Sequence, residues 1–438
     1  MTRLARTLTI AVLAATIAAP AQARPAPPQH DPFYRPDPGY ELTAPGTVLR
    51  SRPVRAALFG AYSLRGSAWQ LLYRTTDTKG APQATVTTVL VPLAKAPNRG
   101  NRPLVSYQPA EDSAAPQCAP SYGLLRGTSI QNPVAQVETV LISGLLARGY
   151  AVTVPDYEGP NSAYTAGRQA GQATLDGVRA TLAFSPAGLR GSATPLGMWG
   201  YSGGALATGW ANELQPGYAP ELRFAGVAAG GLPVSLTDTF RNVNRSVFSG
   251  IGISAITGLS QAYPELATLL DEILTARGRG AVAYAKRHCN SDVAARYPLI
   301  DINKLTTLGR PLEHPVAKSV LADTLLGKHA PAVAPASPTY VYHAIHDELV
   351  SSREVDELLP RYCAGGTPVR YDRDAVSEHV SLAITGGFAA IGWLSDRLEG
   401  RTPVPTGCQT RTTTSTVAAP RSLQELVRFL LRVPKTYR

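Results

Sequence analysis

The serine at position 202 stands in the sequence Gly200-Tyr201-Ser202-Gly203-Gly204, which fits the pattern GxSxG. An apolar run at 196–199 precedes this segment, and an Ala- and Leu-containing run at 205–208 follows it. A strand, a sharp turn and a helix in this order are typical of a nucleophile elbow. Glycines suit the elbow because the serine backbone is strained and the helix and strand come too close for side chains. We therefore predict that Ser202 is a catalytic nucleophile.

A serine hydroxyl needs a neutral imidazole to take its proton and a carboxylate to hold that imidazole in the right tautomer. In hydrolases built on such an elbow the chain order is serine, acid, histidine. Asp347 directly follows a β-rich run at 339–345, and His379 is the only histidine beyond it. We predict Asp347 as the acid and His379 as the base, with Glu348 and Asp356 as alternative acids.

The oxyanion of an acyl-transfer intermediate needs hydrogen-bond donors placed where the charge develops. One donor should be the backbone N–H of Gly203, the residue after the serine. The HGGG segment that supplies further donors in some esterases is absent. The second donor is therefore expected in the loop at 108–113, which follows an apolar run at 104–107.

These residues must be positioned by an alternation of strands and helices that begins near residue 84. Strands are predicted at 84–92, 104–107, 151–156, 196–200, 225–229, 339–345 and 369–371, and helices at 134–148, 168–184, 205–214, 352–362 and 379–398. Such alternation predicts an α/β fold with a mostly parallel sheet flanked by helices. Together with the elbow it predicts the α/β-hydrolase fold.

The alternation lapses between 235 and 330, where helical pieces at 264–277 and 281–287 have no strand partners. We expect this segment to be a helical cap, or lid, whose apolar residues receive acyl chains above Ser202. The predicted organisation is a signal peptide at 1–23, a proline-rich arm at 24–49, the two parts of the core at 50–234 and 331–405, the cap between them, and a C-terminal part at 406–438.

The chain begins with basic residues, an apolar run at 8–19 and Ala21-Gln22-Ala23. This pattern predicts a secretory signal peptide and a secreted mature chain starting near Arg24. The apolar run is shorter than the roughly 20 residues that span a bilayer, so no transmembrane segment is expected.

The C-terminal part combines a Thr-rich link at 410–416 with a predicted helix at 422–432. Apolar residues recur there at helical spacing: Leu423, Leu426, Val427, Leu430 and Leu431. We expect this amphipathic helix to pack on the body of the protein through its apolar stripe, with a helix that seeks a lipid–water interface as the alternative.

The composition indicates a globular protein, with 44% hydrophobic and 17% charged residues. The net charge of +11 is spread along the chain without a basic run or an aromatic platform, which argues against nucleic-acid binding. Attraction to anionic interfaces stays open. His343 and His346 form an HxxH pattern, but in a strand-like run without a zincin glutamate, so no metal site is expected.

The chain has four cysteines, Cys118, Cys289, Cys363 and Cys408. An even number in an exported chain predicts two disulfides, and the sequence alone allows three pairings.

The chain also resembles the secretory lipases that are similar to fungal lipase A, within the α/β-hydrolase superfamily. The resemblance covers most of residues 50–400 and rests on Val105-Ser106-Tyr107-Gln108 with Glu111-Asp112-Ser113, on Val154-Pro155-Asp156-Tyr157-Glu158-Gly159-Pro160, on Leu175-Asp176-Gly177-Val178-Arg179-Ala180, and on the serine, acid and histidine motifs above. It implies an acyl-ester hydrolase with a helical lid and no cofactor, an oxyanion donor at Asp112, and the disulfides Cys118–Cys289 and Cys363–Cys408.

The leading hypothesis is a secreted triacylglycerol lipase that works through an acyl-enzyme on ester or triglyceride substrates, at a lipid–water interface. The alternatives are a short-chain carboxylesterase or a serine peptidase on the same scaffold, and a catalytically silent binding protein with a hydrolase fold.

Overall fold

The computed structural model describes residues 24–97, 100–128, 133–330, 332–404 and 406–437. The predicted signal peptide at 1–23 lies outside these residues. Most of the chain folds around one 10-stranded sheet in the order β1-β4-β5-β7-β6-β8-β9-β10-β11-β12. Its strands are β1 (Val48–Pro53), β4 (Gly66–Thr76), β5 (Pro82–Pro92), β6 (Leu104–Gln108), β7 (Ala151–Pro155), β8 (Leu196–Tyr201), β9 (Phe224–Gly230), β10 (Thr339–Ala344), β11 (Val369–Asp374) and β12 (Cys408–Thr413).

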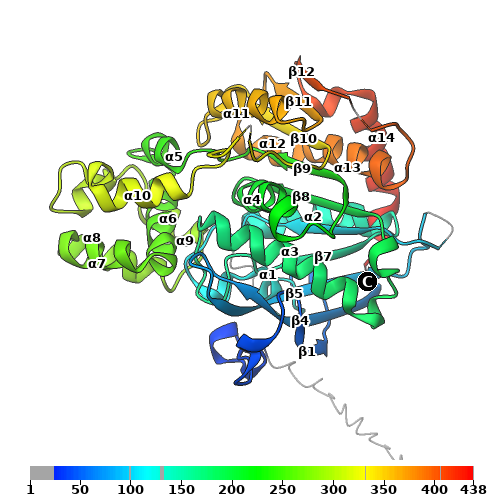
Figure 1. Ribbon diagram of the computed structural model, residues 1–438, viewed down its shortest axis with the longest axis horizontal. Helices are drawn as coiled ribbons and strands as arrows, with labels where there is room; N and C mark the ends of the chain where they lie inside the picture. The colour runs from blue at the N-terminus through cyan, green and yellow to red at the C-terminus, as the bar shows by residue number, and fades with distance from the viewer. Residues whose placement is uncertain (1–23, 98–99, 129–132, 331, 405, 438) are drawn as a thin grey trace, which may run out of the picture.

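The seven strands from β7 to β12 in this order are parallel, whereas β1, β4 and β5 pair antiparallel at one side. Every residue of β6, β7, β8 and β10 is buried, because helices cover both faces of the sheet. One face packs against α2 (Pro133–Ala147), α12 (His379–Thr385) and α13 (Gly387–Leu398). The other packs against α3 (Gly167–Ala183), α4 (Gly203–Tyr218) and α11 (Ser352–Ala364). The predicted fold, a mostly parallel sheet flanked by helices, is confirmed (Figure 1).

Three details differ from the sequence-based expectation. Strands β1 and β4 precede residue 84 and join the sheet by antiparallel pairing, β1 with β4 and β4 with β5, without helices between them. The Thr-rich link contains β12, an edge strand that pairs with β11; its side chains are almost all exposed, so it lacks the apolar alternation that marks a strand. The prediction of a single helix at 379–398 is wrong, because α12 ends before Gly386 and a second helix, α13, begins after it. A Cβ at position 386 would lie 2.4 Å from the ring of Tyr342, so glycine is required there.

The C-terminal helix α14 (Pro420–Arg432) forms as predicted, but its apolar stripe does not pack on the body. Leu423, Val427, Leu430 and Leu431 are exposed to solvent, so that prediction is wrong. The helix is instead held through Phe429, whose ring packs edge-on against Phe388, and through ion pairs of its polar side. These contacts determine which side of the helix faces inward.

Between β9 and β10 the chain forms six helices that gather at one end of the molecule, on the left in Figure 1. They are α5 (Leu236–Val243), α6 (Ser249–Ala262), α7 (Pro264–Ile273), α8 (Ala276–Ala285), α9 (Asn290–Arg296) and α10 (Pro315–Asp323). We call residues 235–330 the cap. The disulfide Cys118–Cys289 joins the cap to the segment after β6, near the short helix α1 (Pro120–Gly123), and Cys363–Cys408 joins α11 to β12. These are the two pairs that the resemblance implied.

Candidate active site

Ser202 occupies a sharp turn between β8, which ends at Tyr201, and α4, which begins at Gly203. Its backbone has φ +52° and ψ −122°, a conformation that an L-residue rarely adopts. The surrounding glycines are required by space: a Cβ at Gly200 would lie 2.2 Å from the carbonyl oxygen of Gly204, and one at Gly204 would lie 1.9 Å from that of Gln108. The turn therefore has the close packing and strain expected of a nucleophile elbow.

His379 is the first residue of α12, and its ring joins Ser202 to Asp347. His379 Nε2 lies 2.8 Å from Ser202 Oγ, and Nδ1 lies 2.7 Å from Asp347 Oδ2. The backbone of His379 is held as well, because its carbonyl accepts from the Tyr201 hydroxyl at 2.5 Å and its N–H donates to Glu348 Oε2 at 2.9 Å. The structure thus brings the three predicted residues into one hydrogen-bonded chain.

Asp347 lies in the turn after β10 with its side chain fully buried. Asp347 Oδ1 accepts the backbone N–H groups of Leu349 and Val350 at 3.0 and 2.7 Å, which leaves Oδ2 for the imidazole. The alternative acids do not contact the imidazole nitrogens: Glu348 accepts the backbone N–H of His379, and Asp356 pairs with Arg373. The geometry favours Asp347 among the three candidates.

Charge and burial act in opposite directions on this pair. Burial favours the neutral form of each side chain, but the mutual attraction and hydrogen bond outweigh it. The pKa of Asp347 is therefore lowered, and the pKa of His379 is raised above its ordinary value. The lowered pKa favours the ionised carboxylate of Asp347, and the raised pKa favours the protonated ring of His379.

A second histidine that the sequence reasoning assigned no role contacts the acid. His343 Nε2 on β10 lies 3.0 Å from the carbonyl oxygen of Val350 and 3.4 Å from Asp347 Oδ2. Both neighbours are acceptors, so Nε2 must carry the proton. Burial lowers the pKa of His343, which favours the neutral ring. The sequence did contain a sign of this contact, because His343 is a polar residue at the end of a buried strand and lies four residues before Asp347. The other histidine of the HxxH pattern, His346, is exposed.

Asp112, the residue that the resemblance implied as an oxyanion donor, has φ +51° and lies next to Gly203. A Cβ at Gly203 would fall 1.7 Å from Asp112 Oδ1, an atom without a hydrogen-bond partner among the described residues. Burial raises the pKa of Asp112 to about 7, although His379 opposes the shift. The carboxyl group can therefore carry a proton near neutral pH.

The loop that carries Asp112 is held by side chains distant in sequence. Glu138 on α2 accepts the backbone N–H of Ala110 at 2.6 Å and the Tyr107 hydroxyl at 3.0 Å. The Tyr157 hydroxyl donates to the carbonyl oxygen of Pro109 at 2.8 Å. No sequence pattern indicated these contacts, because each depends on segments brought together only in the fold.

An apolar pocket with a cavity volume of about 40 Å³ lies beside Ser202 under the cap. Its lining includes Asp112 and Gly203 from the core and Phe240, Ile251 and Ala255 from the cap. A second cavity of about 60 Å³, lined almost entirely by aliphatic side chains, lies among α6, α7, α8 and α10. Phe240 borders both cavities. Over the described residues, no group of three or more His, Cys, Asp or Glu side chains could hold a metal ion.

Residues 125–406 match the sequence profile of the secretory lipases. The chain belongs to the secretory lipase family. The resemblance drawn from its motifs is thereby confirmed, and the protein is a carboxylic-ester hydrolase.

Similar proteins cover most of this chain. A probable inactive lipase of Mycobacterium tuberculosis is 39% identical over 416 residues, covering 94% of this chain and 91% of the relative. A secreted triacylglycerol lipase of Malassezia furfur is 36% identical over 381 residues, covering 85% and 80%. The crystal structure of Candida antarctica lipase A matches with a TM-score of 0.85 at 30% identity, covering 94% of this chain and 96% of that one.

In the part of the chain that the structure describes, no helix is both long and apolar enough to cross a membrane.

Proposed function

We propose that the protein is a secreted triacylglycerol lipase that works through an acyl-enzyme at Ser202. The observation that carries this proposal is the hydrogen-bonded chain Ser202–His379–Asp347, with distances of 2.8 and 2.7 Å, at the mouth of an apolar pocket. This is the arrangement that a serine needs in order to lose its proton as it attacks an ester.

In the acylation step, Ser202 Oγ attacks the ester carbonyl carbon while its proton passes to His379 Nε2. The charge of Asp347 stabilises the imidazolium that forms. The oxyanion accepts the N–H of Gly203 and a hydrogen bond from Asp112. Collapse of the intermediate breaks the bond to the alcohol oxygen, which takes the proton from His379. A water molecule then attacks the acyl-enzyme by the same steps and releases the fatty acid.

We assign the second oxyanion donor to the protonated carboxyl group of Asp112. Its Oδ1 lies against Gly203 in the pocket that holds Ser202, and its pKa of about 7 leaves a substantial protonated fraction near neutral pH. A buried carboxylic acid that stays neutral can donate to an oxyanion much as an amide does.

The cap supports long acyl chains as substrates. The pocket beside Ser202 is lined by aliphatic and aromatic side chains of α5 and α6, and the cavity behind Phe240 adds further apolar volume. Each buried methylene contributes up to about 0.8 kcal/mol, so a chain that fills this space binds more tightly than a short one.

A specific observation favours the second candidate, a short-chain carboxylesterase. The pocket and the cavity are separate spaces with Phe240 between them, so the volume beside Ser202 alone sets the acyl length when Phe240 stays in place. Movement of this ring decides between the two candidates.

Secretion is proposed on independent grounds. The N-terminal pattern is that of a signal peptide, and both disulfides need an oxidising compartment to persist. The family is also one of secretory enzymes.

The decisive experiment treats the protein with an organophosphonate ester and locates the adduct by mass spectrometry. We expect one adduct, on Ser202, and loss of p-nitrophenyl ester hydrolysis in Ser202→Ala. The matched control is Ser254→Ala, because Ser254 is buried on α6 and its Oγ has no hydrogen-bond partner among the described residues. If the wild-type protein were neither labelled nor active, the hypothesis of a catalytically silent binding protein would be supported instead. The mycobacterial relative is itself named a probable inactive lipase.

A further inference from the structure

Helix α14 presents its apolar side to solvent. Leu423, Val427, Leu430 and Leu431 follow one another at i, i+4, i+7 and i+8 and so form one continuous row along the helix. Their exposed fractions are 47%, 56%, 62% and 66%. We call these four residues the outer row. Single exposed aliphatic residues are common on protein surfaces, but a row of them on one helix marks an interaction surface.

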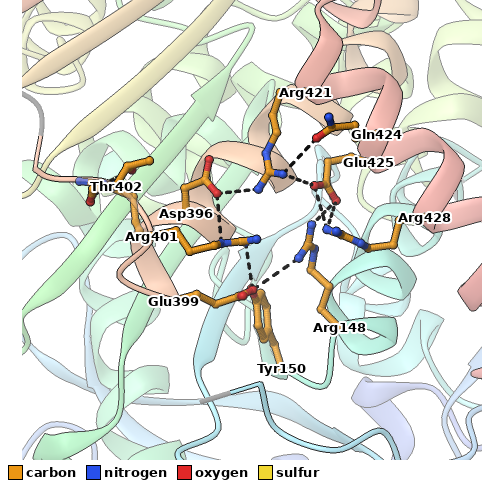
Figure 2. A network of polar contacts seen from close by, with 11 residues as sticks. Arg148, Tyr150, Asp396, Glu399, Arg401, Thr402, Arg421, Gln424, Glu425 and Arg428 are labelled. Carbon is orange, nitrogen blue, oxygen red and sulfur yellow. Dashed lines mark hydrogen bonds and ion pairs between the residues drawn. The ribbon is translucent and has the colours of Figure 1, made fainter. Parts of the chain in front are cut away.

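Ion pairs on the opposite side fix the rotation of the helix (Figure 2). The Glu425 side chain is only 2% exposed and pairs with Arg148 from the end of α2 and with Arg428 one turn along its own helix. Arg421 reaches Asp396 on α13 at 2.5 Å. Turning the outer row inward would leave Arg148 and Glu425 buried without partners, which is strongly unfavourable. The outward direction of the row is therefore built into the fold.

The C-terminal end of the outer row is basic. Arg432 and Lys435 come directly after Leu431 and four residues after it, and both are exposed. Arg421 and Arg428 lie on the inward side, in the ion pairs described above. The network in Figure 2 joins four arginines to three carboxylates, so these seven side chains together carry a net positive charge. An apolar face bordered by cationic side chains is the pattern of helices that lie in the plane of an anionic lipid surface.

We propose that α14 binds the protein to lipid surfaces that carry anionic headgroups, with the outer row entering the acyl layer and Arg432 and Lys435 contacting the headgroups. The inference concerns binding and goes beyond the proposed ester hydrolysis. In Figure 1 α14 and the cap lie at opposite ends of the molecule, so binding through α14 leaves the cap clear of the surface. The protein would be retained at a lipid surface while its pocket stays accessible.

A second copy of the chain fits this face less well. A stable protein interface buries about 800 Å² on each partner, of which four partly exposed side chains supply only a fraction. The basic C-terminal end of the row would also lack a complementary acidic surface on an identical copy of α14.

The test is co-sedimentation of the full mature chain with vesicles of equal parts phosphatidylglycerol and phosphatidylcholine. We expect Leu430→Ser combined with Leu431→Ser to weaken partitioning by about tenfold or more, because leucine burial supplies most of the binding. Combining Arg432→Glu with Lys435→Glu should weaken it in the anionic vesicles and leave the weak binding to pure phosphatidylcholine unchanged. The control is Leu42→Ser combined with Leu93→Ser, since Leu42 and Leu93 are 92% and 75% exposed and lie outside α14.

Unchanged p-nitrophenyl butyrate hydrolysis in each variant would show that folding is intact, and the Ser202→Ala protein should bind vesicles like wild type whether or not the proposed chemistry holds. Equal binding of the outer-row variant and wild type would overturn the proposal. It would also be overturned if wild type did not prefer anionic vesicles, or if light scattering found a dimer that the outer-row variant dissociates.

Discussion

The carboxyl group of Asp112 lies against the α-carbon of Gly203, so close that a Cβ at position 203 would be 1.7 Å from Asp112 Oδ1. Only glycine fits beside this carboxyl group, and the left-handed backbone of Asp112 at φ +51° aims the side chain there. Two proposed oxyanion donors, a backbone N–H and a carboxylic acid, thus depend on one contact.

Substitutions of Asp112 should show whether its hydrogen-bond donation depends on pH, because a carboxylic acid loses its proton as pH rises and an amide does not. Asp112→Ala should lower kcat/KM by roughly 10²–10³, the typical effect of losing one oxyanion donor. Asp112→Asn should retain most activity at neutral pH, since an amide donates at every pH and asparagine tolerates the left-handed conformation. The measurement is the pH profile of p-nitrophenyl butyrate hydrolysis. In wild type, activity should fall as pH rises through about 7, where Asp112 loses its proton, and this fall should be absent in Asp112→Asn.

In the same pH profile, the loss of activity at low pH should result from protonation of His379. The imidazole must be neutral to accept the proton of Ser202, so a raised pKa means that activity is lost as pH falls through a value above the ordinary 6.5 of histidine. Both Asp112 variants should keep this acidic limb of the profile. It should move only slightly, to lower pH, because Asp112 is the last of the charges that raise the pKa of His379. Loss of the limb in the Asp112 variants would contradict the division of roles.

Substitutions of the three candidate acids should differ sharply in their effect on activity. Asp347→Asn should lower kcat by about 10⁴, because it stabilises the wrong tautomer of the histidine. Glu348→Gln keeps an acceptor for the backbone N–H of His379 and should cost less than about tenfold, and Asp356→Asn should cost still less. Steady-state kinetics on the purified variants provide the measurement, and a loss in Glu348→Gln equal to that in Asp347→Asn would reverse the assignment of the acid.

His343 should act as a positioning residue through Asp347. His343→Phe removes the donor near Asp347 Oδ2, leaves more negative charge for His379, and should shift the acidic limb of the pH profile to higher pH. His343→Gln restores an N–H of similar reach and should return the limb toward wild type. If both variants lost activity without moving the limb, the role of His343 would be one of packing alone.

Acyl-chain preference should depend on Phe240. Phe240→Ala joins the pocket beside Ser202 to the cavity among α6, α7, α8 and α10, so the ratio of kcat/KM for decanoate over butyrate should increase. The substitution should also destabilise the protein by roughly 3–5 kcal/mol, as is typical of buried phenylalanines. Phe248→Ala is the matched control, since Phe248 is a partly buried cap residue that lines neither space. An unchanged ratio in Phe240→Ala would favour the short-chain carboxylesterase.

The serine, acid and histidine could be predicted because chain order and strand ends constrain them, and the structure brings these three side chains within hydrogen-bond distance. The alternation of apolar runs was likewise enough for the parallel sheet. The contacts of His343 and Glu138 could not be predicted, because they depend on the tertiary placement of neighbouring loops. The direction of α14 could not be predicted either: helical spacing shows that one side is apolar, whereas Arg148 and Phe388, far away in sequence, decide which side faces inward.

The disulfide between Cys118 and Cys289 fixes the cap to the core at one point. It joins the start of α9 to the segment that follows the Asp112 loop, and the N–H of Asn290 also donates to Ser113 Oγ at 2.9 Å. A movement of the whole cap would therefore be a rotation about this disulfide rather than a detachment of the cap. The residues nearest the disulfide would move least in such a rotation, so the far side of the pocket would open while Asp112 and Gly203 keep their places.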